Sequence, residues 1–149
     1  MPDATIAAAV AYATLAVNGV AGAYAGLLWW QVRTTGAVWP LLRAGQAVAG
    51  LQVLVAGVLY VAGYRPADEL YWLYALLPVA IGFVAEQLRI ISAEQVLENR
   101  ELPDAQAVGA LPESEQRSVV LAVVRREIGI MALAAGVVAF LALRAALIA

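Results

Sequence analysis

The chain of 149 residues is 64% hydrophobic and has a mean hydropathy of +0.82. Soluble domains contain about 45–50% apolar residues, and so small a soluble core cannot hide this excess. Nine arginines stand against eleven acidic residues, for a net charge of −2. This balance excludes a basic nucleic-acid-binding domain and a polybasic lipid-binding module.

The sequence contains no Cys, His or Lys. These absences exclude haem ligation by His, Cys-based zinc or iron–sulfur sites, thiol redox chemistry, His acid–base catalysis and a retinal Schiff base. We therefore expect no metal site, no cofactor and no catalytic residue. A non-enzymatic role is favoured over an enzymatic one.

Four apolar stretches, at about 5–30, 38–63, 70–91 and 118–148, each reach the ~20 residues that cross a ~30 Å hydrocarbon layer. The first is too long for a signal-peptide core of ~7–15 residues and has no Lys or Arg before it, so we expect it to stay in the protein. The sequence predicts an all-α, integral membrane four-transmembrane-helix bundle in a single domain. Its helices would run over about 5–30, 38–63, 68–98 and 114–148, with a polar loop at 99–113.

The first predicted helix consists largely of Ala, Gly and Val. Gly22 and Gly26 form a small-xxx-small pair, which lets helix backbones approach closely in lipid. A contact within the chain is the first interpretation, and a contact between subunits is the second. Asn18 lies near the predicted bilayer centre and needs a hydrogen-bond partner. We interpret it as a packing residue rather than a ligand-binding one.

Small and polar residues line two faces of the second predicted helix. Arg43, Gln46, Gly50 and Gly57 follow at helical spacing on one face, and a second set that includes Gly45 lies on the opposite face. Since lipid prefers Leu, Ile and Phe, we expect protein on both sides of this helix. It would be central in the bundle or shared with another subunit.

The third predicted helix is marked by acids before it and a proline inside it. Asp68 and Glu69 suit its first turn. Pro78 lies mid-span and removes the hydrogen bond to the Tyr74 carbonyl, so we expect a kink and a neighbouring helix that covers the free acceptor. Aromatic belts are expected at both membrane faces, with Trp29, Trp30 and Trp39 at one and Tyr71, Trp72 and Tyr74 at the other.

The segment 99–113 contains Pro and Gly and is predicted to be a loop with one short turn starting at Pro103-Asp104. Ser114 is the expected cap of the last helix. That helix carries a stripe of small residues, including Gly129 and Gly136, which favours close helix packing.

Polar side chains of several helices reach one depth, within about two turns of a membrane boundary. We call this set the polar shelf: Arg43, Gln46, Glu86, Arg89, Arg125, Arg126 and Glu127. In one interpretation the arginines reach lipid phosphates and the glutamates pair with them. In the other the shelf is a cytoplasm-facing vestibule for an anionic headgroup, an ion or a small substrate.

The two glutamates of the shelf need partners. Glu86 is too short to reach far toward water, so we expect it to be ionised and paired with Arg89 or Arg43. Glu127 lies ~200° around its helix from Arg125, at 100° per residue, so both cannot face one cavity. We expect one of them to meet another helix outside the 70–148 hairpin, which would indicate a partner subunit.

The arginines are unevenly divided between the two ends of the predicted bundle. The ends of the chain and the 64–69 connection hold Arg65 and Arg144, and the opposite side holds the other seven. By the positive-inside rule, the side with seven arginines faces the cytoplasm and both termini lie outside. The predicted location is a bacterial-type cytoplasmic (inner) membrane.

One enzyme family has a comparable architecture. The membrane-associated glutathione and eicosanoid enzymes are four-helix proteins with Arg-Ala-x-x-Asn-x-x-Glu in their second helix. The segment 43–50 resembles the first two positions of this motif, with Ala47 and Gly50 where Asn and Glu would stand. The resemblance implies a membrane transferase, which remains a remote alternative whose chemistry is not transferred.

The features together favour a non-enzymatic packing or accessory subunit that forms a homo-oligomer, or joins other membrane subunits, through small-residue helix faces. The alternative is a small transporter or channel that works through the polar shelf. A hydrated path from Glu86 past Pro78 to the outer face would favour transport, and a dry, Ala/Gly-packed outer half would favour the subunit. We expect contact with the lipid bilayer and no nucleic-acid partner.

Overall fold

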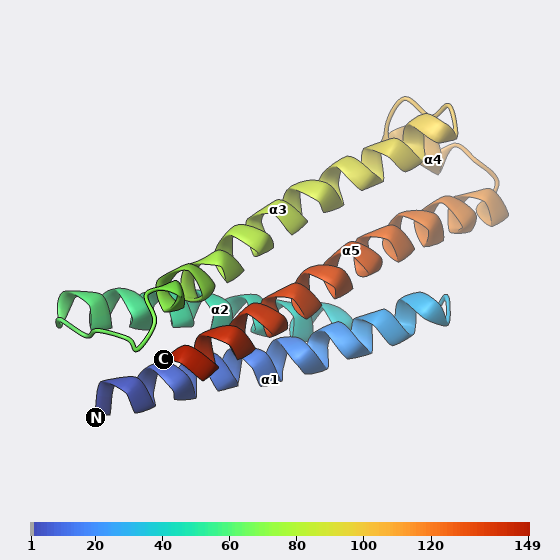
Figure 1. Ribbon diagram of the computed structural model, residues 1–149. Coiled ribbons are helices and arrows are strands. Elements are labelled where there is room, and N and C mark those ends of the chain that lie inside the picture. The colour runs from blue at the N-terminus through green and yellow to red at the C-terminus, as the bar shows by residue number, and fades with distance from the viewer. Residues whose placement is uncertain (1) are drawn as a thin grey trace.

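The computed structural model describes residues 2–149 and contains five helices in that range: α1 (Pro2–Trp30), α2 (Val38–Val61), α3 (Leu70–Asn99), α4 (Ala105–Gly109) and α5 (Glu113–Ile148). All but α4 are long and apolar enough to cross a membrane. The predicted all-α four-helix bundle is confirmed, and the protein is a multi-pass membrane protein. Figure 1 shows the N- and C-terminal ends together at one end of the bundle. We call this the termini end, and the end that carries α4 the loop end.

The longest helix, α5, is the centre of the bundle. It packs most extensively against α1 and α3, whereas α2 packs on α1 and α3 and barely touches α5. The buried face of α2 is the one that carries Gly45, and Leu54 and Val58 on another face are each 68% exposed. Within this chain, therefore, the prediction that α2 is central is wrong. Its second small-residue face contacts another helix of the described chain along only part of its length.

The half of the bundle near the termini end is packed with alanine. Ala7, Ala11, Ala56, Ala75 and Ala145 are each at most 1% exposed and belong to one apolar cluster. Because a methyl side chain keeps helix axes close, this region has the dry, tightly packed character expected of membrane helix contacts.

The aromatic residues at this end form a core cluster. Tyr71 is 1% exposed and meets Tyr64 and Trp72 edge to face, with centroid distances of 6.0 and 5.1 Å. Tyr71 therefore packs inside the bundle near the start of α3, and its predicted place in an aromatic belt stays a prediction. Tyr64 lies between α2 and α3, and burial, followed by the negative charge of Asp3, raises the pKa of its phenol. The phenol stays neutral at physiological pH.

Two of the predicted helix starts are wrong. α3 begins at Leu70, so Asp68 and Glu69 precede its first turn rather than lie in it, and the Asp68 carboxylate accepts from the Leu70 N–H at 2.9 Å. The short turn predicted at Pro103-Asp104 is confirmed as α4, where the Asp104 carboxylate accepts a hydrogen bond from the Ala107 N–H at 2.9 Å. The prediction that Ser114 caps α5 is wrong. The helix begins one residue earlier, after Pro112, whose carbonyl accepts from the N–H of Glu115 at 2.9 Å. The fixed φ of proline suits a helix start, and the cap position is therefore taken by Pro112 instead of Ser114.

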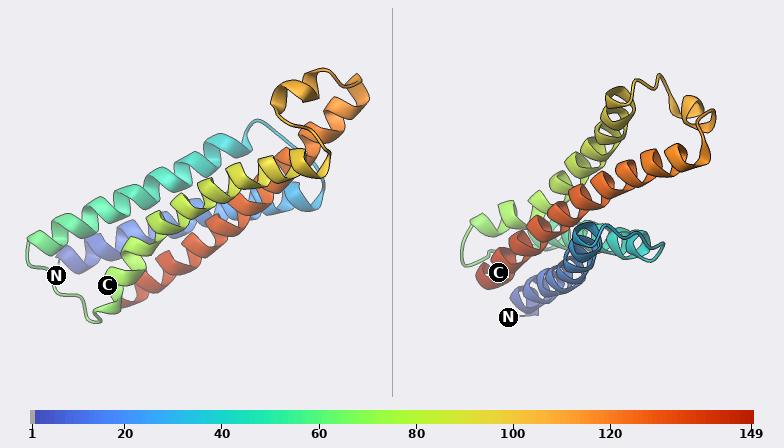
Figure 2. Two further views of the ribbon diagram at one scale, coloured as in Figure 1. Left: turned by 90° about the horizontal axis from the view of Figure 1, so that it is seen from above. Right: turned by 90° about the vertical axis from the view of Figure 1, so that its right-hand side faces the viewer.

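The helices do not stay parallel along their whole length. In Figures 1 and 2 the α3–α5 pair slants away from α1 and α2 toward the loop end. The divergence leaves two regions in the loop-end half where helices are not in full contact. One lies between α2 and α3, and the other lies along α5 between α1 and α3.

Candidate functional site

A chain of ion pairs joins three helices in the loop-end half. The Arg43 Nη1 of α2 lies 2.5 Å from the Glu86 Oε1 of α3. Arg89, one turn further along α3, donates from Nε and Nη2 to Glu86 Oε2, both at 3.1 Å. Its Nη1 also lies 3.4 Å from Glu127 Oε1 of α5. The predicted pairing of Glu86 with arginine is confirmed, and both candidate arginines take part.

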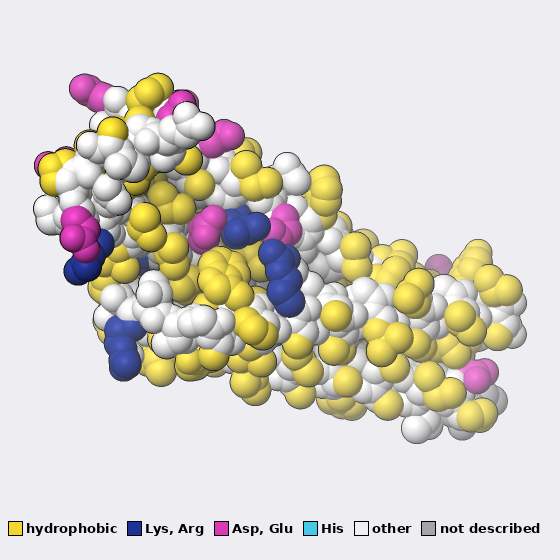
Figure 3. Space-filling view, turned by 180° about the vertical axis from the view of Figure 1, so that it is seen from behind, with side chains coloured by type: hydrophobic (Ala, Val, Ile, Leu, Met, Phe, Trp, Pro, Cys, Tyr) yellow, Lys and Arg dark blue, Asp and Glu magenta, His cyan; other side chains and the backbone are white. Residues whose placement is uncertain are grey.

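Neutral side chains complete this arrangement. Gln46 donates from Nε2 to Glu86 Oε1 at 2.8 Å and accepts at Oε1 from Arg43 at 2.6 Å. The guanidinium of Arg89 lies 5.6 Å from the ring centroid of Trp39, which adds a cation–π contact. Figure 3 shows acidic and basic side chains side by side on one face, while apolar side chains dominate that face toward the termini end. Two positive and two negative charges make the chain of pairs neutral overall.

The remaining two shelf arginines lie outside this chain of pairs. Arg125 donates to the Trp29 carbonyl of α1 at 3.4 Å and lies 5.5 Å from the Trp29 ring centroid. Arg126 has no ion-pair or hydrogen-bond partner among residues 2–149. The sequence correctly separated Glu127 from Arg125. As expected, one of the two, Arg125, meets a helix outside the 70–148 hairpin. That helix is α1 of the same chain, and Glu127 pairs with Arg89 within the hairpin, so neither contact indicates a partner subunit.

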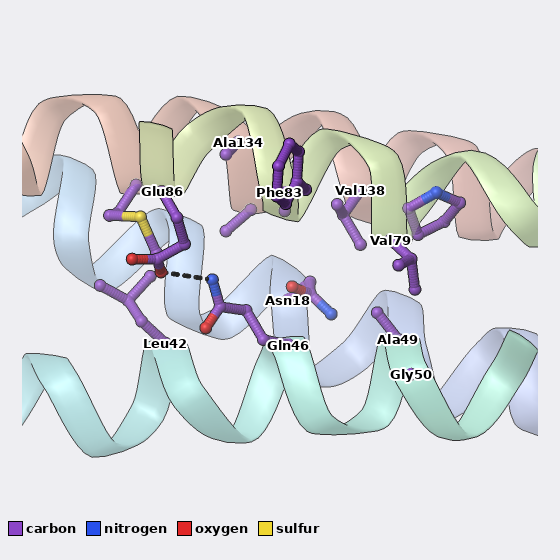
Figure 4. Close-up of a pocket in the computed structure, with 14 residues that line it drawn as sticks. Asn18, Leu42, Gln46, Ala49, Gly50, Val79, Phe83, Glu86, Ala134 and Val138 are labelled. Carbon is purple, nitrogen blue, oxygen red and sulfur yellow. Dashed lines mark hydrogen bonds between the residues drawn. The ribbon is translucent and has the colours of Figure 1, made fainter. Parts of the chain in front are cut away.

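A cavity of about 330 Å³ extends from the chain of pairs into the bundle. Glu86 and Gln46 line one end of it, and Pro78 and Val138 line the other. Asn18 of α1 also lines it, so all four long helices contribute to its walls. Figure 4 shows it between the α3 ribbon above and the α2 ribbon below. From Glu86 to Pro78 the eight-residue separation corresponds to ~12 Å along the helix axis.

The cavity has a lateral opening. Val79 and Phe83 of α3 line it and are also 45% and 66% exposed on the surface of the bundle. Across from them, Gly50 of α2 has no side chain, and a Cβ there would meet no neighbouring atom within 4 Å in the described chain. The mouth therefore lies between α2 and α3, on a surface of the bundle that lipid chains would cover.

Asn18 supplies a polar group in the middle of this cavity. It is 4% exposed, and its amide nitrogen donates to the Thr14 and Gly45 carbonyls, both at 3.0 Å. Both amide hydrogens are thereby used, but the amide oxygen accepts no hydrogen bond from residues 2–149. The oxygen lies so close to Gly45 that a Cβ on that glycine would be 2.7 Å from it. Asn18 thus joins α1 to α2 through its nitrogen and keeps one unused acceptor, so its interpretation as a packing residue rather than a ligand-binding one stays a prediction.

The cavity ends at mid-span. Beyond Pro78, Gln52 is 2% exposed and its Nε2 donates to the Ala75 carbonyl at 3.3 Å. The α2 helix therefore bonds a backbone carbonyl near Pro78, but that carbonyl belongs to Ala75, so the predicted cover of the Tyr74 acceptor stays a prediction. From there to the termini end the alanine-packed core fills the bundle.

The predicted packing glycines divide into two groups. A Cβ on Gly22 would lie 3.1 Å from the Gly136 nitrogen, and one on Gly129 would lie 2.8 Å from the Trp29 indole nitrogen. These are contacts between α1 and α5 within the chain, the first of the two interpretations. In contrast, a Cβ on Gly26, Gly50, Gly57 or Gly136 would meet nothing within 4 Å in the described part of the structure.

The sequence did not predict the cavity or the apolar residues of its walls, such as Met131 and Phe83. An Asn on the small face of α1, opposite the Gly that accommodates it on α2, was the available signal. Searches of family models, curated proteins and solved structures gave no match to this chain.

Proposed function

We propose that this protein is a non-enzymatic membrane subunit that binds one neutral, hydroxyl-bearing amphiphile in the cavity between α2 and α3. The observation that carries the proposal is the Asn18 amide oxygen, which accepts no hydrogen bond from residues 2–149 and belongs to a side chain that lines a cavity of about 330 Å³. Cavities of ~300–1,000 Å³ with a few placed polar groups are typical of small-ligand sites.

The hydrogen-bonding state of Asn18 favours a donor as ligand. Its nitrogen has no free hydrogen, so a group that binds there has to donate to the oxygen. The Asn18 oxygen keeps some accessible surface, so a ligand hydroxyl that donates to it would contribute one net hydrogen bond, about 1 kcal/mol.

The charge distribution favours a neutral ligand. Glu86 already accepts from Arg43, Gln46 and Arg89, and the chain of pairs carries no net charge. A charged headgroup inside the cavity would have to break one of these pairs or remain unpaired in a partly buried position, which is unfavourable.

The walls and the opening favour an apolar tail. Leu42, Met131 and Val138 line the cavity, and the mouth faces the surface that lipid covers. A depth of ~12 Å from Glu86 to Pro78 is close to half of a ~30 Å hydrocarbon layer, so the cavity would lie within one leaflet.

The closed inner end favours binding over transport. The alanine-packed half beyond Pro78 is the arrangement that the sequence associated with a subunit rather than with a transporter or channel. Ala47 is exposed and Gly50 has no side chain, so neither offers the polar group that a transferase of the glutathione and eicosanoid type would use.

We further propose that the loop end faces the cytoplasm, in the inner membrane, with both chain ends outside. Seven of the nine arginines lie at or near the loop end, which supports this orientation. The cavity would then receive its ligand from the cytoplasmic leaflet.

A second candidate function is an accessory subunit that assembles through the exposed face of α2. Gly57 supports it, because it lies in a shallow depression beside Leu54, Val58 and Val61, where a helix of another chain could approach closely. Replacing Gly57 by Leu should then lower the mass of the particle in mild detergent. An unchanged monomer mass for both the wild type and Gly57→Leu would remove this candidate.

The proposed ligand class is tested by thermal unfolding in nanodiscs that contain either a long-chain alcohol or its methyl ether. The alcohol should bind about fivefold more tightly than the ether, because one net hydrogen bond contributes about 1 kcal/mol. In Asn18→Ala the two compounds should become equivalent. Equal stabilisation of the wild type by alcohol and ether would contradict the proposal.

A further inference from the structure

A second concave region lies on the opposite side of the bundle from the mouth of the cavity. It is a groove of about 670 Å³ that follows α5 between α1 and α3, the face that Figure 1 presents to the viewer. Its floor includes Gly26 and Gly129, and Ile130 and Leu133 line it toward the bilayer centre. The groove does not involve the residues proposed to bind the amphiphile.

Two polar groups mark the end of the groove nearest the loop end. Arg126 lines it and has no acidic partner in the part of the chain that the structure describes. Ser92 of α3 also lines it, is 7% exposed, and its hydroxyl makes no hydrogen bond to any described residue. A buried hydroxyl that keeps a free donor at the edge of a groove favours a ligand with acceptor oxygens.

The depth of these groups matches a lipid headgroup. Glu127, next to Arg126, pairs with Arg89, and Ser92 is one turn beyond Arg89 toward the loop end. Both polar groups therefore lie at the level of the polar shelf, near a membrane boundary, while the apolar part of the groove extends toward the bilayer centre. This is the arrangement of a phosphate and an acyl chain in one molecule.

We infer that this groove is a binding site for an anionic phospholipid of the adjoining leaflet. Arg126 neutralises the phosphate, the Ser92 hydroxyl donates to a phosphate or ester oxygen, and one acyl chain lies over Gly26 and against Ile130 and Leu133. Charge complementarity selects a lipid with net negative charge, because a zwitterionic headgroup already carries its own cation. The missing side chain of Gly26 leaves room for the chain, whereas the Trp29 indole lies beside Gly129.

The test is a lipid titration monitored by native mass spectrometry, with phosphatidylglycerol and phosphatidylcholine of identical acyl chains. The wild type should retain phosphatidylglycerol about fivefold more tightly, on the scale of ~1 kcal/mol per arginine near an anionic surface. Arg126→Gln should reduce the affinity to that for phosphatidylcholine. Arg33→Gln is the matched control, because it removes the same charge at the same end from an exposed loop residue outside the groove.

Two further variants keep the inference testable if Arg126→Gln folds poorly. Ser92→Ala should weaken the binding of phosphatidylglycerol, and Gly26→Leu should remove it by filling the groove without a clash. Equal retention of the two lipids by the wild type would overturn the inference. So would equal losses in Arg126→Gln and Arg33→Gln, or a dimer mass that disappears in Gly26→Leu, which would identify a second copy of the chain as the occupant.

Discussion

Arg43 of α2 and Glu86 of α3 are joined by an ion pair of 2.5 Å at the loop-end side of the cavity, where the two helices otherwise have little contact. The pair is partly exposed, with 51% of the Arg43 side chain and 24% of the Glu86 side chain accessible. It joins α2 to α3 across the mouth of the cavity, where the α3–α5 pair slants away from α1 and α2.

Replacing Glu86 should reveal what the pair contributes to stability. Glu86→Gln keeps an acceptor for Arg43 and should lower the free energy of unfolding by about 1 kcal/mol. Glu86→Leu leaves Arg43 without an acidic partner and Arg89 with Glu127 alone, and it should lower the free energy of unfolding by about 2–4 kcal/mol. Unfolding in detergent measures the difference, and equally small losses for both variants would mean that solvent alone satisfies these charges.

The contact between Asn18 and Gly45 predicts strong coupling between two substitutions. Gly45→Ala places a Cβ 2.7 Å from the Asn18 amide oxygen and should cost about 1–3 kcal/mol. Asn18→Ala alone should cost about 1 kcal/mol, because it removes one hydrogen bond within α1 and one between α1 and α2. The double variant should be clearly more stable than the sum of the two losses indicates. Additive losses in the same unfolding assay would mean that α1 and α2 move apart in Gly45→Ala and so avoid the contact between the new Cβ and Asn18.

The orientation can be measured directly because the chain has no natural cysteine. Single cysteines at positions 3 and 106 place one thiol at the termini end and one in α4 at the loop end. A membrane-impermeant reagent applied to intact cells should label the first and leave the second unlabelled until the cells are opened. Labelling at position 106 alone would reverse the orientation and assign the cavity to the outer leaflet.

Much of the architecture could be predicted from the sequence because the bilayer restricts what an apolar helix can do. The four spans follow from run length, and α4 follows from Pro103-Asp104. The pairing of Glu86 with arginine follows from the cost of a lone charge at that depth. The first two inferences use local sequence, and the third uses only the need of one buried charge for a partner. None of them depends on how the helices cross.

The features that failed depend on helix rotation and crossing. Gly22 and Gly26 form one sequence motif, yet Gly22 contacts Gly136, whereas Gly26 lines an open groove although α1 and α5 stay in contact beyond it at Trp29 and Gly129. Glu127 was assigned a direction by its angle around the helix. That angle does not include the reach of Arg89, which spans the space between α3 and α5. The cavity itself arises where the α3–α5 pair slants away from α1 and α2, an arrangement that no single helix encodes.

The central claim, that the space between α2 and α3 binds an amphiphile, is tested most directly by photolabelling with a long-chain alcohol that carries a diazirine on its chain. Labelled peptides should map to the cavity walls near 42–50 of α2 and 78–86 of α3. Gly50→Leu fills the cavity without a clash and should abolish this labelling, whereas Ala47→Leu adds the same side chain at nearly the same depth on the exposed face and should preserve it. Labelling that is spread evenly over the lipid-facing surface, or that persists unchanged in Gly50→Leu, would contradict the claim.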